Sequence, residues 1–177
     1  MFNLAEIKIL FTTLITIFVG ISLGCQTTET NHLTKQEYAV YMTVLSEKPE
    51  NFVVVDETMV DIFGEVSTGY LKELFKELHI ETFDNFVLKN KKSSTIEKSF
   101  PTKNGYPIIS KDDFNKKHSE SSRYYVFSRV GFSEDGKQAL VLFSDACSPL
   151  CGKGVYYLLT NRNGVWEIEK ESETWRS

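Results

Sequence analysis

The last third of the chain is a series of short apolar runs separated by turn signals, and it predicts an antiparallel meander over residues 124–175. The runs lie at residues 124–130, 138–144, 155–160 and 165–173. The second and third are apolar at adjacent positions, which is typical of central strands covered on both faces. In the fourth run, Trp166 and Ile168 alternate with glutamates, so we expect this strand to show one face to water.

The middle of the chain has the apolar spacing of amphipathic helices. Helices are predicted at residues 34–45, 68–79, 83–89 and 110–117, and short strands at 52–55 and 106–109. The first helix opens with a capping box, in which Glu37 follows Thr34 by three positions. Helices upstream of an antiparallel meander indicate an α+β fold, with N-terminal helices packed on a mostly antiparallel sheet. By analogy we favour a curved sheet that wraps the helices, as in the cystatin-like and nuclear-transport-factor-like cones.

The N-terminus has an apolar run over residues 9–23, preceded by Lys8 and followed by Gly24 and Cys25. At about 15 residues it is short for a bilayer-spanning helix and matches the core of a signal peptide. An apolar core that ends in Gly-Cys before a polar tether resembles a bacterial lipoprotein signal. The resemblance implies cleavage before Cys25 and acylation of its thiol and new amine. Ser22 stands where that pattern has an aliphatic residue, so a signal cut by the ordinary peptidase, or an uncleaved anchor, remains an alternative.

These features predict three segments: a lipoprotein signal peptide at 1–24, a polar tether at 25–32 and a single α+β domain at 33–177. The lipoprotein resemblance places the domain in the bacterial cell envelope, on its periplasmic or outer surface. Its partner there would be a membrane, bound through palmitate-type acyl chains on Cys25. Several such chains, at about 0.8 kcal/mol per buried methylene, make the attachment lasting.

Composition narrows the class of partner. The chain is 41% hydrophobic with a net charge of −4, values typical of an ordinary globular domain. Neutralisation of phosphates by lysine and arginine supplies most nucleic-acid affinity, and this sequence has no basic stripe. We therefore expect no nucleic-acid partner.

Cys147 and Cys151 are four positions apart across a proline-containing loop. In an exported protein such a pair is more often bonded than free. The bridge would stabilise the fold by roughly 2 kcal/mol in the chain-entropy model. A redox-active pair is the alternative, although that chemistry usually uses a Cys-x-x-Cys spacing.

Arg129 lies among apolar neighbours in a predicted strand. It is expected at the sheet rim, or buried in an ion pair with a carboxylate such as Asp145; a ligand-binding arginine is the alternative. His32, His79 and His118 are too far apart for the usual metal-ligand spacings. We predict no metal, no cofactor and no catalytic residue from these patterns.

Several short motifs in the last 55 residues occur in a recognisable order: residues 125–132, residues 138–141, Cys151-Gly152, residues 165–168 and Trp175. Together they resemble a family of exported bacterial proteins that pair an N-terminal signal with such a C-terminal domain. The resemblance implies an envelope-associated protein and assigns it no activity.

Two classes of function follow. The first is a non-catalytic binding or structural module with an unidentified protein or small-molecule partner in the envelope. The second is an envelope enzyme or thiol-redox protein that uses the loop between Cys147 and Cys151. A concave pocket with convergent polar groups and perturbed pKa values would favour the enzyme. A sheet mouth filled with aromatic side chains would favour the binding module.

Overall fold

The computed structural model describes residues 32–49, 52–60, 68–99, 107–117, 123–147 and 151–177. The chain divides into two compact units, Met1–Thr30 and Asn31–Ser177, and every described residue belongs to the second. The predicted signal peptide and Cys25 therefore lie outside the described residues. Within the described ranges, no helix combines the length and apolarity needed to cross a membrane.

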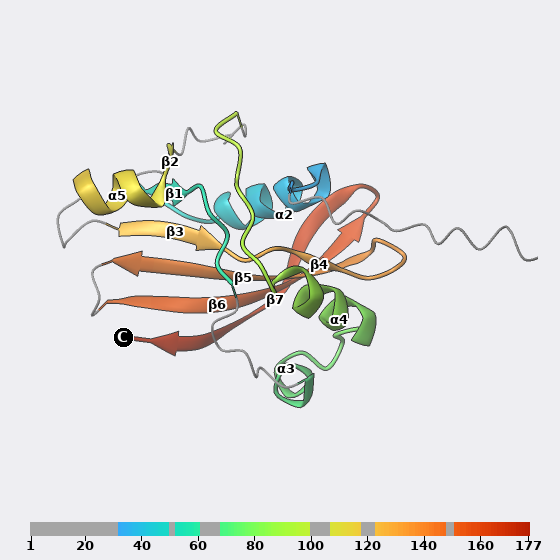
Figure 1. The fold of residues 1–177 in the computed structure, drawn as a ribbon. Coiled ribbons are helices and arrows are strands. Elements are labelled where there is room, and N and C mark those ends of the chain that lie inside the picture. Colours follow the sequence, from blue (N-terminus) through green and yellow to red (C-terminus); the bar gives the residue numbers. More distant parts are fainter. Residues whose placement is uncertain (1–31, 50–51, 61–67, 100–106, 118–122, 148–150) are drawn as a thin grey trace, which may run out of the picture. The chain divides into compact units, whose positions relative to one another are not determined.

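The described residues form one seven-stranded sheet in the order β2-β1-β3-β5-β6-β7, with the short β4 paired to β5 (Figure 1). The strands are β1 (Val53–Val55), β2 (Ile108–Ile109), β3 (Arg123–Phe127), β4 (Gly131–Phe132), β5 (Gln138–Cys147), β6 (Gly152–Arg162) and β7 (Val165–Arg176). Four strands form antiparallel pairs in chain order: β3 with β5, β5 with β6, and β6 with β7. This confirms the predicted meander. Strand β1 pairs parallel with both β2 and β3. The predicted α+β class is confirmed.

The helices fall where the apolar spacing predicts them, with ends shifted by a few residues. They are α2 (Lys35–Leu45), α3 (Thr68–Leu74), α4 (Ile80–Lys89) and α5 (Lys111–Lys117). The capping box of α2 is confirmed as well. The backbone N–H of Glu37 donates to Thr34 Oγ1 at 3.2 Å, and that of Thr34 donates to Glu37 Oε2 at 2.9 Å.

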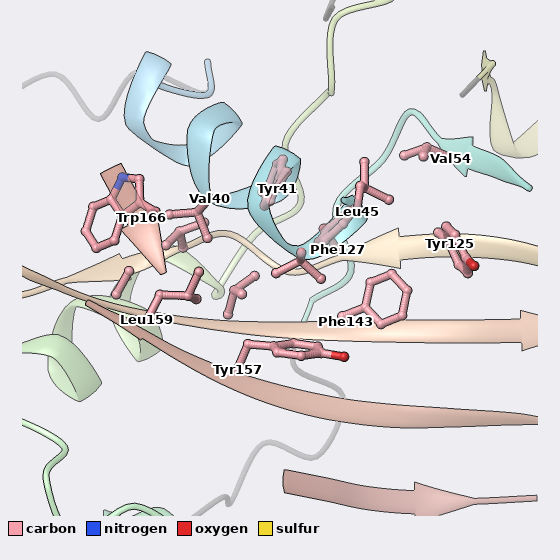
Figure 2. Packing of buried hydrophobic residues seen from close by; sticks show 14 of the residues in the cluster. Val40, Tyr41, Leu45, Val54, Tyr125, Phe127, Phe143, Tyr157, Leu159 and Trp166 are labelled. Atoms are coloured by element: carbon pink, nitrogen blue, oxygen red, sulfur yellow. The ribbon is translucent and has the colours of Figure 1, made fainter. Parts of the chain in front are cut away.

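One face of β5 and β6 packs against α2, through the odd-numbered residues of both strands. Figure 2 shows Tyr41 of α2 above Phe127 and Phe143 of the sheet. The rings of Tyr41 and Phe127 are stacked with centroids 4.4 Å apart, and the Tyr41 hydroxyl donates to the Ser128 carbonyl at 2.7 Å. Buried aromatic pairs of this kind add to the hydrophobic gain from the area they bury.

The even-numbered residues of the same strands point to the opposite face. There Leu140, Leu142, Tyr156 and Leu158 pack against apolar residues of α3 and α4, including Phe86. The prediction that the central strands are covered on both faces is therefore confirmed. Different helices cover the two faces of the sheet: α2 lies on one face, and α3 and α4 lie on the other (Figure 1). In the cone-shaped sheets that we favoured by analogy, the helices would instead lie together on one face of the sheet.

Helix α4 lies very close to β4. At Gly131 a Cβ atom would come within 2.5 Å of the Phe86 amide nitrogen and the Thr82 carbonyl oxygen. Glycine is the residue that allows two backbones to approach so closely. Near this contact, Asn85 Oδ1 accepts from the Phe132 backbone at 3.0 Å, and Lys89 Nζ donates to the Val130 carbonyl at 3.1 Å.

Candidate functional site: an apolar pocket on the sheet

Helices α3 and α4 cover only part of the even-numbered face, and the remainder is the floor of a pocket of about 460 Å³. The register of the sheet places one row of residues across four strands. Val126 of β3 faces Ser144 of β5, Ser144 faces Gly154 of β6, and Gly154 faces Trp175 of β7. Val126, Ser144 and Trp175 line the pocket.

Gly154 makes room for the indole of Trp175. A Cβ atom at this position would overlap with the ring, at Nε1 and the carbons beside it. Because residue 154 has no side chain, the indole can lie against β6 at the edge of the pocket. Glycine within a strand often marks such a close approach. Here the glycine makes room for a side chain.

The segment that follows β1 forms one wall of the pocket. Its backbone is held at several points: Met59 N–H donates to the Phe127 carbonyl at 2.8 Å, and Thr58 N–H donates to the Ser94 carbonyl at 2.8 Å. The Ser94 amide in turn donates to Thr58 Oγ1 at 2.7 Å. Met59 also packs against the α3/α4 cluster, so it separates the open part of this face from the covered part.

The polar groups of the pocket are few. Four described residues of its lining carry a hydroxyl group, Thr58, Ser93, Tyr124 and Ser144, and the lining is otherwise mostly apolar. Its charged members in the described part of the chain are Glu57 and Lys111, with Lys111 Nζ 3.7 Å from Glu57 Oε2 and both side chains substantially exposed. Pockets that hold small molecules are typically of about 300–1,000 Å³ and mainly apolar, with a few polar groups that orient the ligand.

Arg129 is not at the rim, and its partner is not Asp145. Its side chain is 8% exposed and makes a two-pronged ion pair with the fully buried Glu37, with Nε–Oε1 at 2.8 Å and Nη2–Oε2 at 3.2 Å. Asp145 lies instead 3.9 Å from Arg123 Nη1. Of the three expectations for Arg129, the buried ion pair is confirmed, and the choice of carboxylate is wrong.

The remaining donors around this pair are also satisfied. Arg129 Nη1 donates to Ser94 Oγ at 3.0 Å, and the Arg129 backbone N–H donates to Asn90 Oδ1 at 2.7 Å. The Val130 N–H adds a bond to Glu37 Oε1 at 3.3 Å. A buried ion pair is held in this state only when such bonds complete it. The network joins α2, α4 and the wall of the pocket.

The charge state of Glu37 follows from these contacts. Burial alone raises the pKa of a carboxyl, because it penalises the charged form. Here the hydrogen bond from Arg129, the charge of Lys89 and the backbone bond from Thr34 outweigh burial, so the pKa of Glu37 is lower than usual. Glu37 is therefore a carboxylate at neutral pH, and its charge is balanced by that of Arg129 inside the protein.

A second polar contact, which nothing in the sequence marks, lies on the α2 face. Lys48 Nζ donates to the Tyr157 hydroxyl at 2.7 Å and lies 5.6 Å and 5.1 Å from the ring centroids of Phe143 and Tyr157. Burial lowers the pKa of Lys48, while burial and the nearby Glu171 raise the pKa of Tyr157. The ammonium is stabilised by the aromatic rings, as in other cation–π contacts.

The predicted disulfide lies at the β5–β6 hairpin. Ala146 faces Gly152 in the register, so the next positions along the two strands are Cys147 and Cys151. Directly opposed cysteines at a hairpin end have the backbone separation that a disulfide requires. Cys151 is not a free thiol. The side chain of Cys147 lies outside the described residues, so its pairing with Cys151 stays a prediction.

Alkylation followed by mass measurement checks this bridge. Without reductant, we expect neither Cys147 nor Cys151 to react, because opposed thiols in an oxidising compartment are bonded. After reduction, both should gain the mass of the reagent. Modification of both thiols in the unreduced protein would contradict the bridge and restore the redox alternative.

The other predicted positions do not gather into a site. His32 and His79 are both exposed, and His118 lies outside the described residues. Within the described ranges, no group of three or more His, Cys, Asp or Glu residues is placed to hold a metal ion. A polar hollow of about 280 Å³ beside Cys151 is lined by Asp145 and by basic side chains, among them Arg123.

Comparison with known proteins adds no relative. No family model matches the chain, and neither the curated proteins nor the solved structures contain a match.

Proposed function

We propose that this protein is a non-catalytic binding protein of the bacterial envelope, attached to a membrane through Cys25, and that it holds a small apolar molecule in the sheet pocket. The observation that supports binding most directly is the row from Val126 to Trp175, where a glycine and an indole shape a mainly apolar hollow. The lipoprotein-like N-terminus supports the location.

The lining of the pocket favours binding over catalysis. An enzyme of the hydrolytic or acid–base classes needs a nucleophile or base within hydrogen-bond reach of a partner that activates it. Among the residues that the structure describes, the charged members of the lining are Glu57 and Lys111, which pair with each other. The ion pair between Glu37 and Arg129 is buried and is completed by further protein hydrogen bonds. The pocket is therefore better suited to holding an apolar body.

Titration with 1-anilinonaphthalene-8-sulfonate, a fluorescent probe with an apolar aromatic body and a sulfonate group, tests this proposal. We expect saturable binding to the wild type, and affinity at least about tenfold weaker, or about 1.4 kcal/mol, for Ala146→Phe, because the larger side chain fills the pocket. Ala39→Phe is the matched control, since Ala39 is exposed on α2. Equal affinity of Ala146→Phe and Ala39→Phe would contradict binding in the pocket.

A further inference from the structure

We propose that the natural occupant of the pocket is an acyl chain of a phospholipid, taken up from the same bilayer that carries the anchor. This inference rests on the proposed function and names its ligand. Three features of the chain lead to it: the place where the anchored segment enters the domain, the length of that segment, and the distribution of polar groups around the pocket.

The anchored segment enters the domain beside the pocket. His32, the first described residue, forms a parallel β-bridge with Thr95, and Thr95 forms an antiparallel bridge with Glu57. Glu57 and Ser93 both belong to the pocket lining. The entry point at His32 is therefore separated from the pocket only by the segment that contains Thr95.

The covalent chain limits how far this entry point can be from the membrane. Seven peptide steps join Cys25 to His32. At full extension they span at most about 25 Å. A tether of this length keeps the domain close to the bilayer surface and raises the effective concentration of membrane lipid at the pocket. A ligand from the bulk phase has no such advantage.

The pocket matches an amphiphile with one apolar arm and a polar head. Val126, Leu142 and Trp175 supply apolar surface along the floor and edge. Of the described residues around the pocket, Glu57 and Lys111 carry charge, and their side chains are 44% and 66% exposed. An acyl chain on the floor would remove apolar surface of both the ligand and the pocket from water, which is favourable. A phosphate near Lys111 would keep contact with solvent.

Trp175 provides the test, because the chain has only one other tryptophan, Trp166, which packs in the cluster on the α2 face. The full-length lipidated protein is reconstituted in phosphatidylcholine vesicles with or without bromine on the acyl chains, which quenches indole fluorescence on contact. In Trp166→Phe, which keeps Trp175, we expect emission to fall about twofold or more, because such a pocket buries most of its ligand. In Trp175→Phe, emission from Trp166 should not change.

A pocket-filling variant separates occupancy from simple contact with the bilayer. Adding Ala146→Phe to Trp166→Phe should restore most of the emission, whereas Ala39→Phe should not; circular dichroism confirms that each variant is folded. Quenching that persists with Ala146→Phe would overturn the inference, and so would absence of quenching in Trp166→Phe. If the soluble probe still binds in that case, the proposed binding function stands and only the lipid assignment fails. If the probe does not bind either, both fail.

Discussion

Replacement of Arg129 by methionine is expected to lower the free energy of unfolding by about 3–5 kcal/mol, because it leaves the fully buried Glu37 carboxylate without its counter-ion. The loss should exceed that of an ordinary surface ion pair. Arg129 also donates to Ser94, which holds the pocket wall through Thr58, so part of the damage should reach the pocket. Urea denaturation followed by far-ultraviolet circular dichroism measures the change.

Arg162→Met is the matched control for this substitution. Arg162 Nε lies 3.5 Å from Glu167 Oε2, and both side chains are more than half exposed. Exposed pairs of this kind contribute about 0–1 kcal/mol, so the control should unfold close to the wild type. Equal losses in the two variants would show that the buried pair contributes no more than a surface pair.

The pH dependence has a definite sign. Because the folded-state pKa of Glu37 is lowered, its contribution is fully present above the carboxyl pKa of the unfolded chain and is lost as pH falls through the folded-state value. In Arg129→Met, burial is no longer offset by the guanidinium, and protonation of Glu37 removes the unpaired charge. We therefore expect the stability gap between wild type and variant to narrow as the solution is acidified. A gap that widens in acid would contradict this account.

Gly131→Ala is expected to lower the free energy of unfolding by about 1–3 kcal/mol, the range typical of overpacking. Its Cβ would come within 2.5 Å of backbone atoms of Phe86 and Thr82. These atoms belong to α4, whose position is set by the packing of Phe83 and Phe86 in the cluster on the even-numbered face. Relief of the clash therefore requires the whole helix to move. The same denaturation measurement reports the change.

Gly154→Ala is the informative comparison, because the new methyl group would meet the side chain of Trp175 and not a helix backbone. A side chain can rotate away, so we expect a smaller loss of stability than in Gly131→Ala. The displaced indole should instead change Trp175 emission and weaken binding of the probe in the Trp166→Phe background. A loss of stability in Gly154→Ala equal to that in Gly131→Ala, with unchanged probe binding, would contradict the role assigned to this contact.

The elements of this fold were predictable because their signals are local. Adjacent apolar residues in β5 and β6 indicate strands covered on both faces, and the structure places α2 on one face and α3 and α4 on the other. The capping box at Thr34 and Glu37 marks the start of α2 within four residues of sequence. Such signals depend on backbone geometry and side-chain periodicity over one or two turns, and a single sequence contains them in full.

The partners of these residues were not predictable in the same way. Glu37 and Arg129 are 92 positions apart, and Asp145 was an equally reasonable partner from the sequence, because choosing a carboxylate requires knowing how α2 crosses the sheet. The pocket was not predictable for the same reason. It exists because the strand register aligns Val126, Ser144, Gly154 and Trp175 while α3 and α4 end short of them. The strands, the helices and the capping box of α2 therefore follow from local patterns in the chain. Which charges neutralise each other, and where apolar surface is left open, depends instead on contacts between segments far apart in the chain.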